Sequence, residues 1–444
     1  MNPPFLVVAG VRTVTANWQV RYTSTLLRLL NKKIEAVNLL TRFTAFTFFG
    51  RKIYFKLKMI QTPISIKISE TSREYKISVG HDLLPNCGDW ARNCLADSTQ
   101  KIALISNAKV FRLYGAAVKK KLEAAGFAVF VWLMKDGEKH KNLCSLENAL
   151  SFFSANKLTR SDAVVALGGG VVGDLAGFAA AVFLRGIAFL QIPTTLLAMI
   201  DSSVGGKTAV NSAFGKNLIG AFHQPEGVLI DSATLKTLPR RELTAGFCEA
   251  VKQGAISDEN LFNQTARFLK NYAPEKFKKY FSEQDFIVNL ENLIAAQIAF
   301  KAKIVANDER ENIARTDTKS RKILNFGHTV AHALEKITDY KYFKHGEAVG
   351  YGILAAGEIA KNVGIFDKDT LNLLNDVVLS VGTLPATGKI EVEKVIEAFE
   401  FDKKSSGKNL QWILLKEIGE PVIFDGKNIP PQILRKSLKT VLNR

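Results

Sequence analysis

Between residues 101 and 193, short apolar runs alternate with segments of helical period, and this alternation limits the possible folds more than any other feature. The runs KIALIS (101–106), AVFVWLM (128–134) and IAFLQIP (187–193) predict strands, and DAVVALGGG (162–170) predicts a buried strand that ends in glycines. Helical period fills the intervals, at 110–125, 146–156 and 174–182. This β-α-β-α-β order predicts an α/β domain, a parallel sheet with helices on its faces.

From about residue 239 the helical period continues with few strand signals. The predicted helices are 240–256, 258–270, 285–307, 326–338, 346–363, 367–380 and 391–400. A chain of 444 residues has room for about two to three domains. We therefore expect an α/β domain over 59–238, opened by the alternating strands ISIKIS and REYKISVG, and a mostly helical domain over 239–444.

The first 58 residues differ from the rest in charge. They hold ten Lys and Arg residues against one acidic residue, Glu35, and so carry half of the net charge of +18. Three interpretations compete: a targeting segment, an appendage with an amphipathic helix around 25–40, or an upstream extension of a protein that starts at Met59. We favour the extension, poorly packed and without a catalytic role.

Composition excludes several classes of protein. The 47% hydrophobic content is typical of a globular protein with a large core, and no apolar run approaches the roughly 20 residues of a membrane helix. Four cysteines without CxxC spacing predict free thiols and a cytoplasmic, reducing compartment. Beyond residue 58 no basic stripe with interleaved aromatic residues occurs, so neither a nucleic-acid nor a membrane partner is expected.

A glycine-rich turn follows the strand at 162–170. Gly168, Gly170 and Gly173 fit the pattern G-x-G-x-x-G between a strand and a helix. Glycines there let backbone amides approach a pyrophosphate, and a helix N-terminus attracts the anion. A tight structural turn is the alternative. The acidic residue that usually follows about 20 positions on, to bind the ribose, is not evident. A nucleotide site here would therefore differ from the usual one, and Glu138 in the loop DGEKHK could supply the carboxylate for the ribose. The alternative is that DGEKHK is an ordinary solvated loop.

Two glycine–lysine turns follow within the stretch 193–225. Small and hydroxyl side chains surround Asp201, Lys207, Lys216 and Asn217. Lysines among glycines leave room for a phosphorylated ligand and supply its counter-charge. The alternative is surface lysines in turns.

Three of the six histidines fall within eighteen residues, at positions 328, 332 and 345. His328 and His332 are four apart and so share a helix face. Glu249 lies on an earlier predicted helix, with Lys252 three residues on. Two imidazoles and one carboxylate form a three-ligand zinc set with an open position, as in catalytic sites. Spacing alone does not choose two of the three histidines, and core packing is the alternative.

Six ordered motifs together resemble the 3-dehydroquinate synthases, within the sugar-phosphate cyclases. They are GGGVVGDLAGFAAAVFLRGI, QIPTTLLAMIDSSVGGKTAVN, GKNLIGAFHQP, EAVKQG, NFGHTVAHA and HGEAV, within a resemblance from about residue 60 to the C-terminus. The resemblance implies a Rossmann-like N-terminal NAD-binding domain plus a mostly α-helical C-terminal domain that binds metal and substrate. It also implies bound NAD, one Zn²⁺ or Co²⁺, a homodimer, and conversion of 3-deoxy-D-arabino-heptulosonate 7-phosphate, a sugar phosphate, to 3-dehydroquinate and phosphate in the shikimate pathway.

The resemblance also assigns residues by motif. Its metal ligands are Glu249, His328 and His345, which leaves His332 for proton handling or phosphate contact. Its substrate contacts are Arg185, Asp201, Lys207, Asn217, Lys252, Lys301, Arg321, Asn325 and one of Lys403 and Lys404. Its NAD contacts are Glu138, Lys141, Gly169, Gly170, Asp174, Thr194, Thr195, Lys207 and Lys216.

The sequence departs from the family pattern at two places. Asn107 and Lys109 stand where family members often carry Asp and Asn, and the segment 312–319 lengthens the link between Glu311 and Arg321. Three rival functions remain: another sugar-phosphate cyclase, an NAD- and metal-dependent polyol dehydrogenase, and a basic binding protein with a structural metal. The last needs a fourth ligand, for which the sequence offers no candidate.

Overall fold

The computed structural model describes residues 44–48, 51–55, 74–406 and 410–443, with the backbone alone described at 44–48, 51–55 and 400–406. The chain divides into two compact units, Met1–Ser72 and Arg73–Arg444. In the first unit, β1 (Thr44–Phe48) and β2 (Arg51–Phe55) pair as an antiparallel hairpin. The remainder of the predicted extension and the boundary at residue 59 lie outside the described residues.

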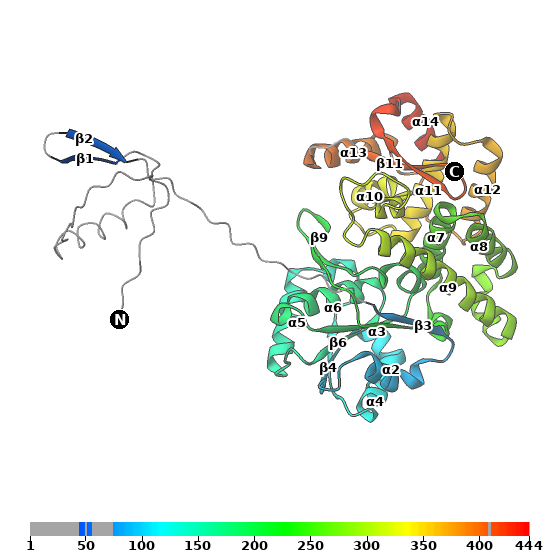
Figure 1. Cartoon of the computed structure of the whole chain (residues 1–444). Helices are drawn as coiled ribbons and strands as arrows, with labels where there is room; N and C mark the ends of the chain where they lie inside the picture. The colour runs from blue at the N-terminus through cyan, green and yellow to red at the C-terminus, as the bar shows by residue number, and fades with distance from the viewer. Residues whose placement is uncertain (1–43, 49–50, 56–73, 407–409, 444) are drawn as a thin grey trace, which may run out of the picture. The chain divides into compact units, whose positions relative to one another are not determined.

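A six-stranded sheet forms the first part of the second unit (Figure 1). Its order is β3-β10-β7-β6-β4-β5, and each neighbouring pair is parallel. The strands are β3 (Lys76–Gly80), β4 (Lys101–Asn107), β5 (Ala128–Met134), β6 (Ala163–Gly168), β7 (Ala188–Pro193) and β10 (Gly227–Asp231). The predicted parallel sheet and its four strands between 101 and 193 are thereby confirmed. The opening run ISIKIS lies outside the described residues.

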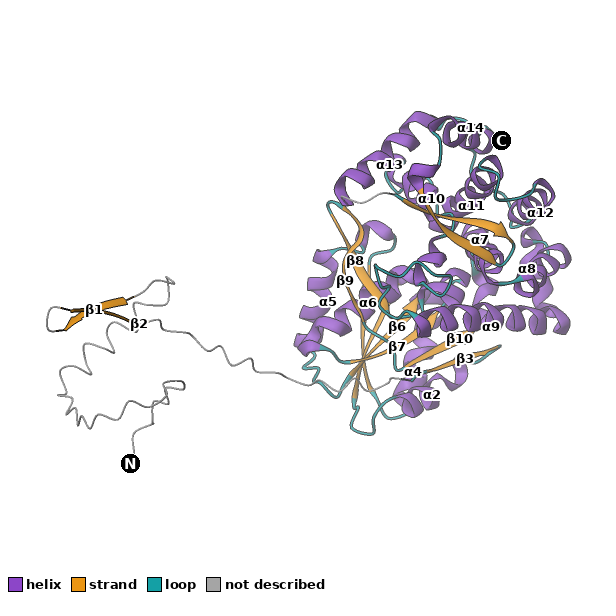
Figure 2. Ribbon diagram, turned by 45° about the horizontal axis from the view of Figure 1, so that its top comes forward, coloured by secondary structure: helices purple, strands orange, loops and turns teal. Residues whose placement is uncertain are grey.

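The sheet is buried on both faces, as continuous apolar strands require. Along β6, Val164 and Ala166 join one hydrophobic cluster, while Val165 and Leu167 join another on the opposite face. The helices that complete these two clusters are α5 (Leu143–Ala155) and α6 (Gly170–Val182) in the first, and α2 (Cys87–Cys94) and α4 (Ala116–Ala124) in the second. Figure 2 shows this layered arrangement. Helix α6 starts four residues before the predicted position. Its first turn contains glycines, which have no side chain and so give no signal in a hydrophobic pattern.

The two predicted glycine–lysine turns are instead an antiparallel hairpin. Its strands are β8 (Lys207–Ser212) and β9 (Gly215–Phe222). Lys207 and Lys216 therefore lie on strands, so the prediction of turns was wrong. The tight turn sits between the strands, at residues 213 and 214.

The second part of the unit is mostly helical. Its helices are α7 (Arg240–Ser257), α8 (Glu259–Asn271), α9 (Gln284–Asn307), α10 (His328–Ile337), α11 (His345–Asn362), α12 (Lys368–Leu379), α13 (Val392–Ser406) and α14 (Pro431–Leu442). The seven predicted helices are present. The sequence did not predict α14 or the hairpin of β11 (Gln411–Glu417) and β12 (Glu420–Asp425).

Helix α11 is central to this part and is buried along nearly its whole length. A Cβ on Gly346 would lie 1.9 Å from the carbonyl oxygen of Ala245 on α7, and one on Gly352 would lie 1.9 Å from the carbonyl oxygen of Gly327. Both contacts are closer than any side chain permits, so glycine sets the approach of these backbones. In the part of the chain that the structure describes, no helix has the length and apolarity to cross a membrane.

Candidate active site between the glycine loop and three helices

Three helices bring the metal ligands implied by the resemblance close together. Glu249 lies on α7, while His328 and His345 are the first residues of α10 and α11. Nε2 of His345 is 3.5 Å, and Nε2 of His328 is 3.9 Å, from Oε1 of Glu249. One ligand atom from each residue lies within 4.8 Å of the other two. Small side-chain movements would place all three about 2.0–2.2 Å from one tetrahedral ion.

The chemistry of this donor set fits a divalent metal ion. Oε1 of Glu249 is buried and has no hydrogen-bond partner among the described residues, which is costly unless a cation fills the gap. Nδ1 of His328 lies 3.2 Å from the carbonyl oxygen of Phe326, and Nδ1 of His345 lies 3.1 Å from Oε2 of Glu335. With both Nδ1–H groups donating to these oxygens, each Nε2 presents its lone pair toward Glu249.

The protonation of the two histidines depends on their surroundings. Burial, followed by the charge of Lys252, holds the pKa of His328 well below its usual range, so this ring is neutral and able to bind a metal. Burial also opposes protonation of His345, but the hydrogen bond and charge of Glu335 outweigh it and raise the pKa of His345. A bound cation would favour the neutral form of both rings.

Asp201 links the metal-ligand cluster to two buried lysines. Nζ of Lys252 is 2.6 Å from Oε2 of Glu249 and 3.4 Å from Oδ2 of Asp201, while Nζ of Lys301 on α9 contacts Oδ1 of Asp201. Burial would raise the pKa of Asp201, but the two ammonium groups hold it well below its usual range. Burial lowers the pKa of Lys301 to about 8, and Asp201 offsets only part of this effect.

The glycine loop lies at the carboxyl ends of β6 and β7. Gly169 is the N-cap of α6, and no side chain caps that helix. A Cβ on Gly169 would lie 3.0 Å from Cγ2 of Thr195, and one on Gly170 would lie 2.9 Å from Oγ of Ser202. Thr194 donates its backbone N–H to the carbonyl oxygen of Gly168 at 2.9 Å. The first amides of α6 are thus presented to an anion. Because the connections reverse direction between β4 and β6, this is also where an open α/β sheet binds ligands.

Lys141 is the centre of a polar network beside this loop. Its Nζ donates to Oδ2 of Asp174 at 2.7 Å and to Oδ1 of Asn217 at 2.6 Å, and it lies 3.2 Å from Oε1 of Glu138. Burial opposes the charge of Lys141, but Asp174 and Glu138 outweigh it and raise the lysine pKa. Asn211, which the sequence analysis did not select, donates to Oε1 of Glu138 at 2.8 Å. Asn217 thus lies among the residues assigned to NAD.

An ion pair joins the hairpin β8–β9 to the histidine helix α10. Nζ of Lys216 on β9 donates to Oε1 of Glu335 on α10 at 2.8 Å. Burial disfavours the charged form of Glu335 and would raise its pKa, but His345 and Lys216 together lower this pKa to about 2. Sequence analysis missed Glu335, although it follows His332 by three residues and so shares its helix face.

Three further residues that the resemblance assigns to the substrate lie around the loop before α10. Arg321 is buried and donates to the carbonyl oxygens of Gly205 at 3.0 Å and Glu309 at 2.7 Å. Lys207 forms an ion pair with Glu311, whose Oε1 accepts a hydrogen bond from Asn325 at 3.4 Å. Despite the lengthened link, Glu311 thus contacts two of the residues assigned to substrate.

The remaining predicted residues are placed differently. The ring centroid of His332 is 5.5 Å from that of His328 and 6.0 Å from that of His345, with its side chain exposed. Arg185 is also exposed and has a positive φ of 69°; no hydrogen bond or ion pair joins it to another described residue. The side chains of Lys403 and Lys404 lie outside the described residues.

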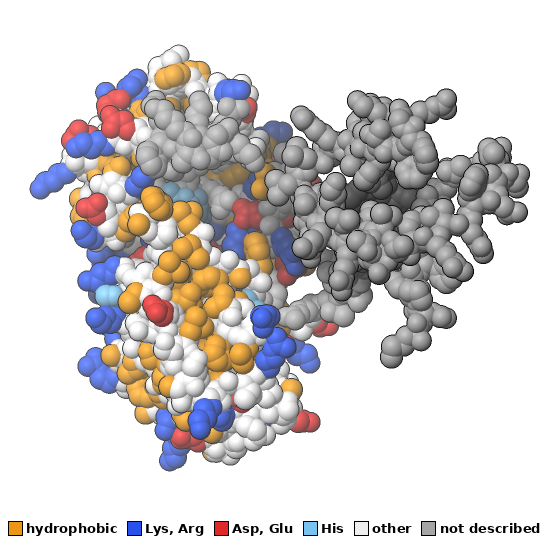
Figure 3. All heavy atoms as spheres, turned by 90° about the vertical axis from the view of Figure 1, so that its left-hand side faces the viewer, with side chains coloured by type: hydrophobic (Ala, Val, Ile, Leu, Met, Phe, Trp, Pro, Cys, Tyr) orange, Lys and Arg blue, Asp and Glu red, His pale blue; other side chains and the backbone are white. Residues whose placement is uncertain are grey.

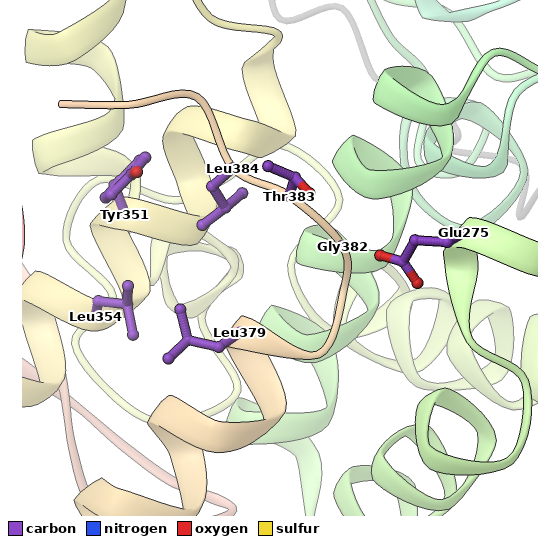
Figure 4. A pocket seen from close by; sticks show the side chains of 7 residues that line it. All are labelled: Glu275, Tyr351, Leu354, Leu379, Gly382, Thr383 and Leu384. Atoms are coloured by element: carbon purple, nitrogen blue, oxygen red, sulfur yellow. The ribbon is translucent and has the colours of Figure 1, made fainter. Parts of the chain in front are cut away.

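A groove separate from these residues opens beside the middle of α11. It has a volume of about 380 Å³, and its lining mixes apolar side chains, among them Tyr351, Leu354 and Leu379, with polar atoms and one charged residue, Glu275 (Figure 4). None of the residues assigned to metal, substrate or NAD lines it. The groove therefore plays no part in the site described above.

Comparisons with known proteins identify the family of this chain. The sequence profile of the 3-dehydroquinate synthase N-terminal family matches residues 131–245, and that of the 3-dehydroquinate synthase C-terminal family matches residues 246–405. The 3-dehydroquinate synthase of Nostoc punctiforme is 39% identical over 381 residues, which cover 84% of this chain and 98% of the relative.

Solved structures share the fold. A 2-epi-5-epi-valiolone synthase from Streptomyces hygroscopicus with NAD⁺ and Zn²⁺ bound has a TM-score of 0.72 at 23% identity, covering 85% of this chain and 99% of its own. A 2-deoxy-scyllo-inosose synthase complexed with carbaglucose-6-phosphate, NAD⁺ and Co²⁺ has a TM-score of 0.68 at 24% identity, covering 82% and 96%. The profiles and the Nostoc relative show that this chain belongs to the 3-dehydroquinate synthase family.

Proposed function

We propose that this chain converts 3-deoxy-D-arabino-heptulosonate 7-phosphate into 3-dehydroquinate and phosphate, with NAD and one Zn²⁺ or Co²⁺ as cofactors. The reaction is a carbon–oxygen lyase step of the shikimate pathway, which leads to chorismate and the aromatic amino acids. One observation carries the proposal: the cluster of the buried Glu249 and the partly buried His328 and His345 is joined by Lys252 to Asp201 and by Glu335 to Lys216, beside the glycine loop. Family membership supports it.

The donor atoms of the site match the chemistry of both cofactors. Oε1 of Glu249, which has no hydrogen-bond partner among the described residues, suits a metal ion together with the Nε2 atoms of His328 and His345. The first turn of α6, which no side chain caps, suits a pyrophosphate. When bound, the ion would supply Lewis-acid polarisation of a substrate oxygen, and NAD would accept a hydride and later return it, so that no net oxidation would result. Glu138 and Asp174 suit the polar parts of the nucleotide.

The surrounding cations serve the substrate. Lys252, Lys301 and Arg321 are all buried, and each would offset part of the negative charge of a phosphate or carboxylate. Oxidation of a neighbouring hydroxyl acidifies the C–H bond that must break for phosphate to leave. The departing phosphate can accept that proton itself, so a site rich in cations needs no dedicated carboxylate base. His332, exposed beside the metal ligands, suits phosphate contact, and ring opening and aldol closure complete the carbocycle.

We also expect a homodimer in the cytoplasm, without a membrane or nucleic-acid partner. Large hydrophobic side chains are exposed on the β8–β9 hairpin, with Phe214 at 92%, Leu218 at 64% and Phe222 at 43% of their full area. Figure 3 shows hydrophobic side chains gathered on the side of the molecule where β9 and α5 lie in Figure 1. Such a patch favours a protein contact. All four cysteines are free, in keeping with a reducing compartment.

Turnover by the full chain tests the proposal. The protein is incubated with the heptulosonate phosphate, a trace of NAD and Zn²⁺, and both phosphate and dehydroquinate are measured. We expect the two products in equal amounts and no accumulation of NADH. Phosphate release from a hexose 6-phosphate instead would indicate another sugar-phosphate cyclase, and accumulation of NADH with a polyol would indicate a dehydrogenase.

A further inference from the structure

A second group of metal-binding side chains lies next to the first. One ligand atom each from His332, Glu335 and His345 lies within 4.8 Å of the other two. Nδ1 of His345 and Oε2 of Glu335 are already 3.1 Å apart, close to the separation of two ligands on one tetrahedral ion. The rings of His332 and His345 lie 6.0 Å apart at an angle of 25°. In this group, here called the outer set, His345 turns Nδ1 toward Oε2 of Glu335, whereas its Nε2 faces Oε1 of Glu249.

The outer set repeats the build of the inner set, which consists of Glu249, His328 and His345. Each has two imidazoles and one buried carboxylate. In each, one carboxylate oxygen faces a histidine and the other faces a lysine: Oε2 of Glu249 is 2.6 Å from Lys252, and Oε1 of Glu335 is 2.8 Å from Lys216. The two sets therefore offer a cation similar ligands and a similar neighbouring charge.

The two sets differ in their access to solvent. The side chain of Glu249 is fully buried and that of His328 is 12% exposed, whereas His332 in the outer set is exposed. An ion that arrives from solvent therefore meets the outer set without any movement of the helices. Its partial hydration there would make this site weaker than the inner one, because nearby water screens the attraction between the ion and the carboxylate.

We propose that His332, Glu335 and His345 form a second, outer site for a divalent metal ion, used as an alternative to the inner site. The proposal rests on the inner set binding metal, as proposed above. A neutral imidazole has one lone pair, so His345 serves the inner ion through Nε2 or the outer ion through Nδ1, but not both. The chain then holds one ion at a time, and His345 passes it between the two positions by exchanging the roles of its ring nitrogens.

Removing His328 separates the two sites. Metal-free protein is titrated with Co²⁺ alone by calorimetry, as wild type, His328→Ala, His328→Ala/His332→Ala and the matched control His328→Ala/His140→Ala. We expect wild type to bind one ion, and His328→Ala to bind one ion more weakly. The further loss of His332 should weaken Co²⁺ binding by roughly tenfold or more, because even the loss of a residue that only orients a metal ligand costs that much. The further loss of His140 should leave Co²⁺ binding unchanged. Equal binding by His328→Ala and His328→Ala/His332→Ala would overturn the proposal.

X-ray absorption at the cobalt edge gives an independent measurement that does not depend on affinity. In His328→Ala, an ion in the outer site has two imidazole ligands, from His332 and His345. An ion left in the inner site would have one, from His345, and that result would also overturn the proposal. Neither experiment measures turnover, so an inactive wild-type protein that binds Co²⁺ in this pattern would contradict the proposed function and leave the outer site standing.

Discussion

The metal-ligand cluster and the glycine loop lie in one unit but are built in opposite ways. In the cluster, ionisable side chains from α7, α10 and α11 converge, and their positions depend on how closely those helices pack. In the loop, the proposed recognition of NAD depends on the backbone after β6, where Gly169 and Gly170 have no side chain and a Cβ would be crowded. A cluster of side chains is therefore sensitive to the charge of each member, whereas the loop is sensitive to added volume.

The largest effect should come from the charge of Glu249. Glu249→Gln keeps the shape of the side chain but removes the negative ligand, and it leaves Lys252 buried beside a neutral amide. Lewis-acid stabilisation is worth several kcal/mol, so we expect kcat/KM to fall roughly a thousandfold, together with the affinity for Zn²⁺. Steady-state kinetics and calorimetry measure the two quantities.

The control is Glu123→Gln, which changes the same type of side chain in an exposed pair with Lys119. It should alter the free energy of unfolding by less than about 0.5 kcal/mol and leave turnover unchanged. Wild-type metal affinity in Glu249→Gln would show that this carboxylate is not a ligand.

The next effect concerns helix packing beneath the cluster. Gly346→Ala would place its Cβ 1.9 Å from the carbonyl oxygen of Ala245, which forces α7 and α11 apart next to His345. We expect the free energy of unfolding to fall by about 1–3 kcal/mol, as for other overpacked sites, and metal affinity to fall with it. Denaturant melts measure the first quantity.

Gly388→Ala is the matched change, because no atom lies within 4 Å of its added Cβ. It should change the free energy of unfolding by less than about 0.5 kcal/mol. If both variants melted alike, the close approach of α7 and α11 would not be what fixes the cluster.

The pH dependence distinguishes two lysines that share Asp201. Burial lowers the pKa of Lys301 to about 8, whereas Asp201 and Glu249 outweigh burial and raise the pKa of Lys252. Above pH 8, Lys301 loses its charge and Lys252 keeps it. If Lys301 binds an anionic group of the substrate, kcat/KM should fall above pH 8, by up to tenfold per pH unit.

Protein stability should change in the opposite direction over the same range. An unfolded Lys301 stays protonated up to its ordinary pKa, so between pH 8 and that value the unfolded chain binds more protons than the folded chain. The free energy of unfolding should therefore rise with pH across this window. Lys301→Gln should remove both the fall in kcat/KM and this rise in stability, and an unchanged alkaline limb in that variant would assign it to another group.

Sequence patterns predicted the strands and helices of this unit better than the contacts that bring its site residues together. Apolar runs between helical segments located the parallel strands, and helical period located seven helices. The hairpin β11–β12 was missed because the apolar run from Trp412 to Leu415 is short and lies in a part of the chain where helical period dominates. The hairpin β8–β9 was also missed, because glycines next to lysines suggested turns.

Contacts between distant segments could not be predicted in this way. The clustered histidines and Glu249 pointed to metal chemistry, and the resemblance selected His328 and His345 from the three histidines. The structure brings these two close to Glu249. Glu335 was missed because its importance comes from Lys216, 119 residues earlier in the chain. No local pattern contains that pairing. Ion pairs of this kind depend on where a hairpin and a helix meet, which only the folded chain determines.

The smallest effect concerns the glycine loop, where added volume should matter more than charge. Gly170→Ala would place a Cβ 2.9 Å from Oγ of Ser202, on the first turn of the helix assigned to the NAD pyrophosphate. We expect the Kd for NAD to rise about tenfold, or about 1.4 kcal/mol, measured by calorimetry. Two causes are possible: the new methyl group displaces Ser202, or it blocks the approach of NAD to the backbone.

The double variant Gly170→Ala/Ser202→Ala separates these causes, with Ser202→Ala alone as the reference. If the clash with Ser202 is responsible, removing its hydroxyl makes room for the methyl group, and the double variant recovers most of the affinity for NAD. If the backbone must touch the nucleotide, the two changes add without recovery, because the methyl group still stands between the amide and the phosphate. We expect addition, since a loop that recognises its ligand through the backbone cannot be repaired from the side away from that ligand.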